Sequence, residues 1–196
     1  MDNQPENPSS PGTPGEKSEP STTSPVQAMS YFLKEVQAAP QFTLQTYIKY
    51  VQNLGKEIHD KHGIMWLVPC VQSAHESRYG NSGLARNHGN LFGITATEKW
   101  KKNGNIIASM PTWEVINGKK INTTREFRGY VSWRDSFYDW ARIITELNIY
   151  KHAFTLLKDQ ATVPEGITEM GRVYATDPAY AKKLLEMYNV ARGLSL

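Results

Sequence analysis

Residues 65–80 read MWLVPCVQSAHESRYG, and this stretch decides the expected fold. Its first two turns are almost wholly apolar, and Pro69 is tolerated there because proline fits the first turn of a helix. A helix that is apolar on most sides belongs in the middle of a domain. The stretch therefore predicts a central helix over residues 65–78, with Glu76 near its end, just before a glycine-rich loop.

Two amphipathic patterns precede the central helix. Apolar residues recur at three- and four-residue spacing over residues 29–36, and Pro40 closes that run. A second helix is expected over residues 43–62, because Gly63 stands where a helix C-terminal glycine is common. Its apolar stripe comprises Tyr47, Ile48, Val51, Leu54 and Ile58.

The segment after the central helix predicts a small β lobe. Glycines break the periodicity between residues 80 and 105, which indicates loops and short turns. Residues 106–116 and 119–130 then flank Asn117-Gly118, a strong hairpin signal. Helical patterns return further along the chain, over residues 132–147, 150–158, 163–174 and 179–192. The expected fold is mainly α, with a small β-hairpin lobe inserted after the central helix.

The N-terminus differs in composition from the rest. The first 25 residues hold six of the eleven prolines and no aromatic residue, so they cannot bury enough apolar surface to offset the entropy of ordering. We expect a disordered tail over residues 1–26 and one domain over residues 27–196, long enough for a full hydrophobic core.

The formal charge is unevenly distributed. The tail carries −3, so the rest of the chain carries +3 − (−3) = +6. A basic domain suits a polyanionic partner such as nucleic acid or bacterial cell wall. The chain lacks clustered Lys and Arg with interleaved aromatic residues, which argues against nucleic acid.

No stretch resembles a secretory signal peptide or a membrane span, because no window approaches ~18 consecutive apolar residues. We expect a protein made in the cytoplasm that another system delivers to its place of action. Cys70, the one cysteine, lies in an apolar run and is expected to be a buried structural thiol. A cysteine nucleophile served by His75 or His88 stays open as an alternative.

Glu76 is the residue best placed for chemistry. Burial and the negative end of the helix dipole would both raise the pKa of its carboxyl, as a general acid requires, although Arg78 would oppose this if it came close. A surface glutamate at a frayed helix end is the open alternative.

We predict no metal site. His75-Glu76 invites comparison with the zinc pattern H-E-x-x-H, but Tyr79 stands where the second histidine belongs. His59 and His62 are three residues apart, without a third apparent ligand. No cofactor is expected either.

Several motifs follow one another in order between residues 74 and 181. They read HESRYGNSGLA (75–85), GNLFGI (89–94), TWEVING (112–118), FRGYVS (127–132), SFYDW (136–140) and YATDPAYA (174–181). Together they resemble the signature of the bacterial glucosaminidases of glycoside hydrolase family 73. One such match would be weak evidence, whereas several in register are strong.

The resemblance implies a lysozyme-like helical domain with the small β lobe across a substrate groove. It also implies a peptidoglycan hydrolase that cleaves the β-1,4 bond after N-acetylglucosamine. Glu76 matches the catalytic acid and Glu114 a second carboxylate on the hairpin. Asn90 and Phe92 match substrate-binding positions near the groove, and Tyr174 matches a tyrosine that positions substrate or water.

The sequence departs from the family pattern at three positions around the expected acid. His75 replaces a small or apolar residue, Arg78 a frequent glycine, and Gly89 the first asparagine of the N-N-L-F-G-I motif. These departures leave the local polarity around Glu76 open. Inverting chemistry, retaining chemistry and assistance by the substrate's acetamido group all stay open as mechanisms.

Two further questions stay open at this stage. A peptidoglycan-binding or assembly module without turnover is the alternative to an active enzyme. The delivery route could be that of a phage lysis enzyme or of an injected antibacterial effector. An injected effector would need a periplasmic immunity protein as its partner.

Overall fold

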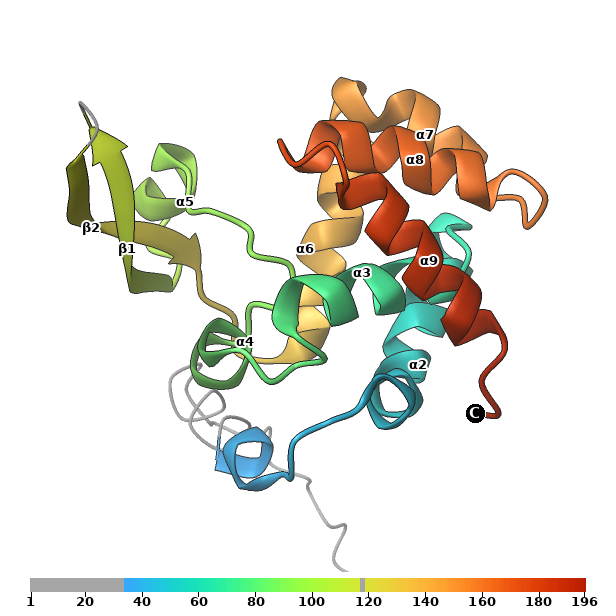
Figure 1. The fold of residues 1–196 in the computed structure, drawn as a ribbon, viewed down its shortest axis with the longest axis horizontal. Helices are drawn as coiled ribbons and strands as arrows, with labels where there is room; N and C mark the ends of the chain where they lie inside the picture. The colour runs from blue at the N-terminus through green and yellow to red at the C-terminus, as the bar shows by residue number, and fades with distance from the viewer. Residues whose placement is uncertain (1–33, 117–118) are drawn as a thin grey trace, which may run out of the picture.

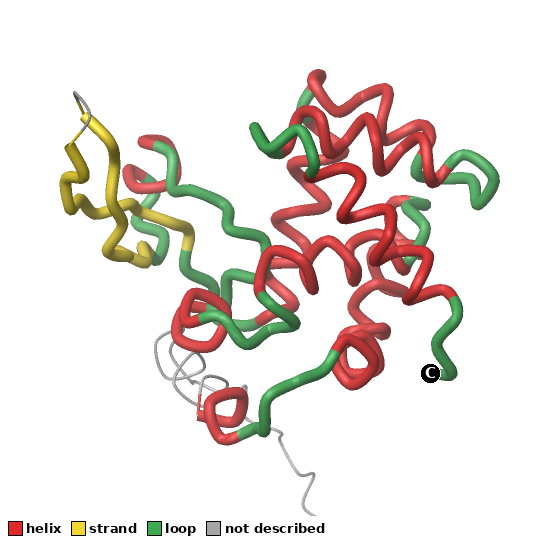
Figure 2. The backbone as a smooth tube through the Cα atoms, in the orientation of Figure 1, coloured by secondary structure: helices red, strands yellow, loops and turns green. Residues whose placement is uncertain are grey.

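The computed structural model describes residues 34–116 and 119–196, with side chains described outside residues 112–120. Helices gather in one lobe, and a two-stranded hairpin with a short helix stands apart from them (Figures 1 and 2). After a helical segment at residues 34–38, the elements are α2 Leu44–His62, α3 Leu67–Ser77, α4 Gly83–His88, α5 Glu98–Lys102, β1 Ile107–Ile116, β2 Lys119–Arg128, α6 Trp133–Glu146, a 3-10 turn Asn148–Tyr150, α7 Lys151–Leu156, α8 Val163–Tyr174 and α9 Tyr180–Arg192.

The mainly α fold with a small β lobe is confirmed. The expected disordered tail at residues 1–26 lies outside the described residues. So does the start of the first expected helix, whose described end at residues 34–38 buries Val36 against the core.

The helix α3 is the centre of the helical lobe, as predicted. Helices α2, α6 and α9 all contact it, and only His75 and Glu76 of its residues are partly exposed. Pro69 lies in its first turn, where the backbone N–H groups have no partner within the helix. The apolar run therefore forms a buried central helix, and Glu76 in its last turn is partly exposed.

Local capping signals end the long helices where the sequence indicates. The Thr43 hydroxyl accepts the backbone N–H of Thr46 at 3.3 Å, and Gly63 closes α2 with a φ of 75°. Ser132 and Asp135 form a reciprocal capping box at the start of α6. These short-range contacts satisfy the free backbone groups at the helix ends and so help to define the helix bounds.

The glycine-rich segment was expected to form loops and short turns only, and this expectation is wrong in two places. Helices α4 and α5 lie within it. Each begins at a hydroxyl cap, because Ser82 accepts the N–H of Ala85 and Thr97 accepts that of Trp100, both at 3.2 Å. Gly89 and Gly104 stand at or just after the C-terminal ends of α4 and α5, but the glycine spacing did not predict the short helices themselves.

The β lobe is an antiparallel hairpin. Its register pairs Ile107 with Arg128 and Ile116 with Lys119, which confirms the two predicted strands. The expected turn at Asn117-Gly118 lies outside the described residues. A bridge between Thr95 and Phe127 attaches the loop after α4 to the second strand.

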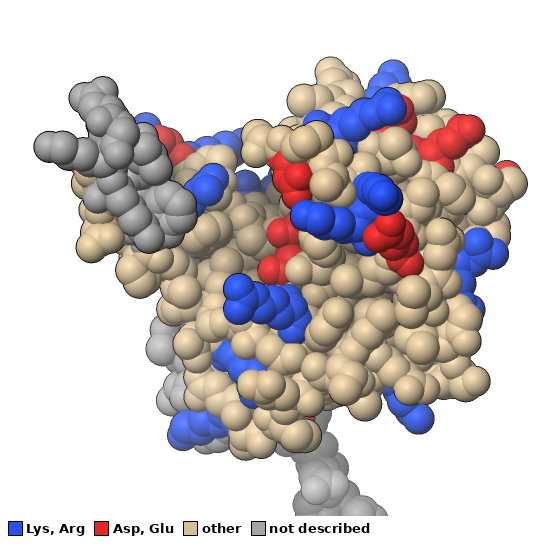
Figure 3. Space-filling view, in the orientation of Figure 1, with Lys and Arg blue, Asp and Glu red and all other residues tan. Residues whose placement is uncertain are grey.

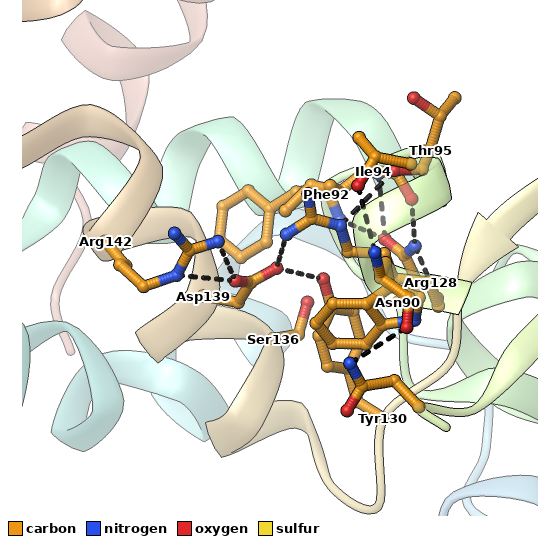
Figure 4. Close-up of polar contacts among 12 residues, drawn as sticks. Asn90, Phe92, Ile94, Thr95, Arg128, Tyr130, Ser136, Asp139 and Arg142 are labelled. Carbon is orange, nitrogen blue, oxygen red and sulfur yellow. Dashed lines mark hydrogen bonds and ion pairs between the residues drawn. The ribbon is translucent and has the colours of Figure 1, made fainter. Parts of the chain in front are cut away.

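A buried ion pair fastens the base of the β lobe to α6 (Figure 4). The Arg128 guanidinium lies 2.6 Å from Asp139 Oδ2, and the two side chains are 9% and 10% exposed. The Tyr130 hydroxyl donates to the same oxygen at 2.7 Å, and Arg142 holds the other carboxylate oxygen at 2.8 Å. Because both oxygens of Asp139 are satisfied, this charge is tolerated in a buried place.

Cys70 is buried on α3, with its sulfur 3.3 Å from the Trp66 carbonyl oxygen. Burial raises the pKa of this thiol, so the side chain is held as a neutral thiol. This environment supports the structural interpretation of Cys70 over the nucleophilic one.

Among the described residues, no helix has the length and apolarity needed to cross a bilayer.

A glycine in the α2–α3 contact provides the first prediction. A β-carbon at Gly55 would lie 2.4 Å from the Trp66 carbonyl oxygen and 2.5 Å from Cys70 Sγ. We expect Gly55→Ala to lower the free energy of unfolding by about 1–3 kcal/mol, the cost of overpacking a core, as measured by urea denaturation. Gly83→Ala is the matched control, because its nearest atom would be 3.8 Å away. Equal stability of the two variants would contradict the close helix packing.

Candidate active site

Glu76 lies in the last turn of α3, which an uncommon backbone turn ends. Arg78, Tyr79 and Gly80 all adopt positive φ angles, of 53°, 60° and 74°. The Tyr79 N–H bonds back to the Ala74 carbonyl at 2.8 Å, which closes the helix immediately after Glu76. Consecutive non-glycine residues in this conformation are rare and cluster at functional sites.

The Glu76 carboxyl is partly buried. Its Oε1 accepts a hydrogen bond from the Tyr180 hydroxyl at 2.6 Å. Burial raises the pKa of Glu76, and the Tyr180 hydrogen bond partly opposes that rise. No Lys, Arg or His in the described part of the chain makes an ion pair with this carboxyl, so the concern over Arg78 is not realised. A carboxyl in these surroundings can hold a proton at a pH where an ordinary glutamate is ionised.

The other departure from the family pattern next to Glu76 is His75. Its ring packs edge-on against Tyr180, with ring centroids 5.3 Å apart. Burial lowers the pKa of this imidazole, which favours its neutral form. His75 therefore supports Tyr180 from the side without adding a charge beside Glu76.

The loop that joins the two lobes faces Glu76. A β-carbon at Gly93 would lie 3.7 Å from Glu76 Oε2, so the backbone of this loop passes close to the carboxyl. Gly93 has a φ of 65°, which favours glycine. Glu76 is thus positioned where the helical lobe meets the segment that leads to the hairpin (Figure 1).

Asn90 holds that loop in shape (Figure 4). Its side-chain N–H groups donate to the carbonyl oxygens of Ile94 and Arg128, at 3.0 and 2.8 Å. Its side-chain oxygen accepts the N–H groups of Phe92 and Ile94, both at 3.2 Å. Asn90 is 1% exposed, so its amide holds the loop from within.

Phe92 has a similar internal place. Its ring is fully buried and stacks on Trp140, with centroids 5.4 Å apart and the ring planes 18° from parallel. The Asn90 and Phe92 side chains thus support the loop from within, and their expected part in substrate binding stays a prediction. The sequence could not reveal this burial, because both residues occupy a motif that looks like an exposed loop.

Tyr174 lies at the end of α8 and braces the same loop. Its hydroxyl donates to the Phe92 carbonyl oxygen at 2.7 Å, and its ring stacks on that of Tyr180 at 6.1 Å. Burial raises the pKa of Tyr174, so the hydroxyl remains a donor. Tyr174 as a whole residue is partly exposed, and its expected part in positioning substrate or water stays a prediction.

Glu114, the expected second carboxylate, lies in β1 opposite Ile121. Its side chain lies outside the described residues, and its catalytic role stays a prediction. The side chain of Trp113 is likewise outside them. Two other tryptophans are engaged in packing, since Trp133 is 1% exposed and Trp100 packs on Tyr130 and on Arg128.

The surface between the lobes is hollowed. In the space-filling view, a depression separates the hairpin side from the helical lobe, and both acidic and basic side chains border it (Figure 3). A further cavity of about 430 Å³ adjoins Tyr174 and is lined by residues 171–178 together with Ala181. Within the described ranges, no group of three His, Cys, Asp or Glu side chains is placed to hold a metal ion.

Sequence reasoning missed two residues of this site, Tyr180 and Gln72. Tyr180 directly contacts Glu76, and Gln72 hydrogen-bonds to Tyr180 at 3.0 Å. Tyr180 is the second tyrosine of the YATDPAYA motif, and Gln72 precedes Glu76 by one helical turn. The four-residue spacing from Gln72 to Glu76 was the available signal, since it places both on one helix face.

Comparison with known proteins gives a consistent result. Residues 52–192 match the glucosaminidase family model, described as mannosyl-glycoprotein endo-beta-N-acetylglucosaminidase. A probable N-acetylmuramidase of Lactococcus lactis subsp. cremoris (strain MG1363) is 30% identical over 164 residues, which cover 80% of this chain and 36% of that protein. The chain thus spans about a third of the length of this curated relative.

Two solved structures share the fold. The catalytic domain of the autolysin Auto from Listeria monocytogenes has a TM-score of 0.63 and 26% identity, covering 81% of this chain and 93% of that one. A type VI secretion system effector-immunity complex from Pseudomonas protegens has a TM-score of 0.53 and 18% identity, covering 76% of this chain and 92% of that one.

The raised pKa of Glu76 predicts a pH-dependent effect on stability. The folded state holds this proton more tightly than the unfolded state, so ionisation of Glu76 destabilises the fold as pH rises above the ordinary value of 4.5. We expect Glu76→Gln to unfold at a higher temperature than the wild type at neutral pH. That advantage should disappear below pH 4.5, where both states of the wild type are protonated. Thermal unfolding at the two pH values measures it.

The control for this prediction is Glu186→Gln, which removes an exposed carboxylate in the middle of α9, away from the helix ends. Its unfolding temperature should follow the wild type at both pH values. A Glu76→Gln variant that is less stable than the wild type at neutral pH would show that the carboxylate is favoured in its site.

Proposed function

Because this chain belongs to the glucosaminidase family of glycoside hydrolases, we propose that it hydrolyses peptidoglycan at the β-1,4 bond after N-acetylglucosamine, with Glu76 as the general acid. The observation that carries the proposal is the state of the Glu76 carboxyl. It is partly buried at the end of the central helix, its pKa is raised, and it adjoins the loop between the lobes.

Glycoside hydrolysis needs a proton on the departing oxygen and stabilisation of an oxocarbenium-like transition state. Glu76 supplies the proton, because its surroundings keep the carboxyl protonated at a higher pH than usual. Tyr174 and the Gly93 loop frame the space in front of it. The hollow between the lobes suits an extended polymer, which must enter and leave along its length.

The second catalytic group is proposed to be Glu114. A strand on the opposite lobe can carry a carboxylate across a groove, and Glu114 lies in β1 of that lobe. Carboxyl groups ~6.5–9.5 Å apart would make the enzyme inverting and ~5–5.5 Å retaining. If Glu114→Gln keeps most of the activity, the acetamido group of the substrate itself is the nucleophile.

The relatives' names support a cell-wall substrate and differ on the bond. The Lactococcus relative is named a probable N-acetylmuramidase, whereas the family model is that of an N-acetylglucosaminidase. These activities leave different sugars at the new reducing end. Our proposal is the N-acetylglucosamine end, on the strength of the family motifs around Glu76 and Glu114.

We also propose a protein partner that occupies the hollow. The Pseudomonas protegens chain of the same fold is in a complex with an immunity protein. If this chain is likewise an injected effector, it should kill a Gram-negative host when directed to the periplasm and be harmless in the cytoplasm. A chain toxic in the cytoplasm would contradict both the substrate and the delivery route.

The central test is the loss of one transferable proton. We expect Glu76→Gln to retain its fold and to lower the rate of sacculus hydrolysis by about 10²–10⁴-fold, the usual contribution of a general acid. Turbidity loss and muropeptide release measure the rate, with Glu186→Gln as the matched control. Wild-type turnover in Glu76→Gln would refute the assignment, and no turnover in the wild type would favour a binding module.

The products identify the bond. Digested sacculi should carry N-acetylglucosamine at the new reducing ends, as read by reduction with borohydride and mass spectrometry. Ends at N-acetylmuramic acid would instead show muramidase action.

The pH dependence of turnover has a definite sign. Because Glu76 must be protonated to act, kcat should fall as pH rises through its raised pKa. A rate that stays constant from acid to neutral pH and beyond would contradict the acid role of Glu76.

A further inference from the structure

Behind Glu76 lies a chain of buried polar side chains that the proposed mechanism does not use. The indole N–H of Trp140 donates to Gln72 Oε1 at 2.8 Å. The amide of Gln72 donates to the Tyr180 hydroxyl oxygen at 3.0 Å, and Tyr180 donates to Glu76 at 2.6 Å. Trp140 and Gln72 are 0% exposed and Tyr180 is 5% exposed. Three helices, α6, α3 and α9, thus meet in one hydrogen-bonded series.

The chemistry of these groups gives the series a single direction. An indole N–H can only donate, so the Gln72 oxygen must face Trp140 and its NH₂ group must face Tyr180. That NH₂ group also can only donate, so the Tyr180 oxygen accepts from it. The hydroxyl hydrogen of Tyr180 is then directed to the remaining neighbour, Glu76 Oε1. The ordinary ambiguity of a glutamine amide is absent here, because Trp140 removes it.

This direction has a consequence for the acid. Glu76 Oε1 is occupied as an acceptor, so a proton bound by Glu76 belongs on Oε2. Oε2 is the oxygen closest to Gly93, on the loop between the lobes. The transferable proton is therefore presented on the side of the carboxyl where a substrate would lie. A tyrosine free to rotate could instead accept a hydrogen bond from protonated Oε1, which would turn the proton inward.

We propose that Gln72 is a positioning residue of this enzyme, which fixes Tyr180 as a donor to Glu76 Oε1 and so places the catalytic proton on Oε2. The assignment rests on the proposed function of Glu76 as general acid. Gln72 acts through Tyr180 and touches neither substrate nor reacting atoms. The geometry also accounts for the burial of the Gln72 amide within α3, since both ends of the amide are hydrogen-bonded.

The experiment replaces Gln72 with methionine, which is similar in length and cannot donate to Tyr180. We expect kcat on purified sacculi to fall by about tenfold or more with little change in KM, because substrate binding does not involve Gln72. Without Gln72, the Tyr180 hydroxyl can turn and no longer always donates to Glu76, so the ionised form of Glu76 loses part of its stabilisation. The basic limb of the pH profile should therefore move to higher pH. A merely structural role would lower the amount of folded protein without moving the profile.

A second readout does not depend on turnover. The ¹³C chemical shift of the Glu76 side-chain carboxyl, assigned by its absence in Glu76→Gln, reports the titration of this group directly. Its midpoint should be higher in Gln72→Met than in the wild type. The matched control is Gln160→Met, because Gln160 also donates to a buried tyrosine of α9, Tyr188, at 3.0 Å. Its midpoint should equal that of the wild type.

A double-mutant cycle separates action through Tyr180 from general damage. Tyr180→Phe should raise the Glu76 midpoint by itself. The double variant Gln72→Met/Tyr180→Phe should raise it no further, since Gln72 has no other route to Glu76. An additive shift in the double variant, or an unchanged midpoint in Gln72→Met, would overturn the proposal.

Two outcomes keep this test distinct from that of the proposed function. If the wild type hydrolyses no sacculi, the proposed function fails while the carboxyl titrations still decide the role of Gln72. If Gln72→Met does not fold, Gln72→Leu replaces it, because leucine likewise has no group that donates to Tyr180 and adds no charge beside Glu76. That variant should likewise shift the Glu76 midpoint upward, and a midpoint equal to the wild type would again refute the proposal.

Discussion

The hydrogen bond from Tyr180 to Glu76 depends on two helices, α9 and α3, that are far apart in the sequence and adjacent in space. The two residues are separated by 104 positions, so the bond can form only when α9 has packed along α3. A carboxyl group that is removed from water needs a partner or a proton. Here it has one hydroxyl partner and no cation from the described side chains, which leaves the protonated form accessible. The chemistry of the site follows from that balance.

The loop in front of Glu76 is also held by buried polar groups that all have hydrogen-bond partners. Asn90 uses both its N–H groups and its oxygen on backbone partners, and Tyr174 satisfies the carbonyl of Phe92. Phe92 in turn stacks on Trp140, the residue that also orients Gln72. Trp140 therefore contacts both the loop in front of Glu76 and the hydrogen-bonded series Gln72–Tyr180 behind it. A disturbance of the α6 core would reach the carboxyl from two sides.

Much of the fold could be predicted from local signals, and the site only in part. The bounds of α2 follow from a hydroxyl cap, a closing glycine and regular apolar spacing, all of which act over a few residues. Glu76 was found because its position at the end of an apolar helix is itself a local feature. Tyr180 and Gln72 were missed because their importance arises from a tertiary contact across 108 positions. The burial of Asn90 and Phe92 was not predicted either, since burial within a motif is not encoded in spacing.

Gly93 matters to the site because it has no side chain. Its backbone stands opposite Glu76 Oε2 with a positive φ, and a methyl group there would sit 3.7 Å from that oxygen. The position leaves the Oε2 side of the Glu76 carboxyl without a loop side chain from residue 93. Under the proposed mechanism, a residue with a side chain at position 93 would strain the loop through its positive φ and add atoms in van der Waals contact with Oε2, so the clearance at this glycine limits how closely a bridging oxygen can approach.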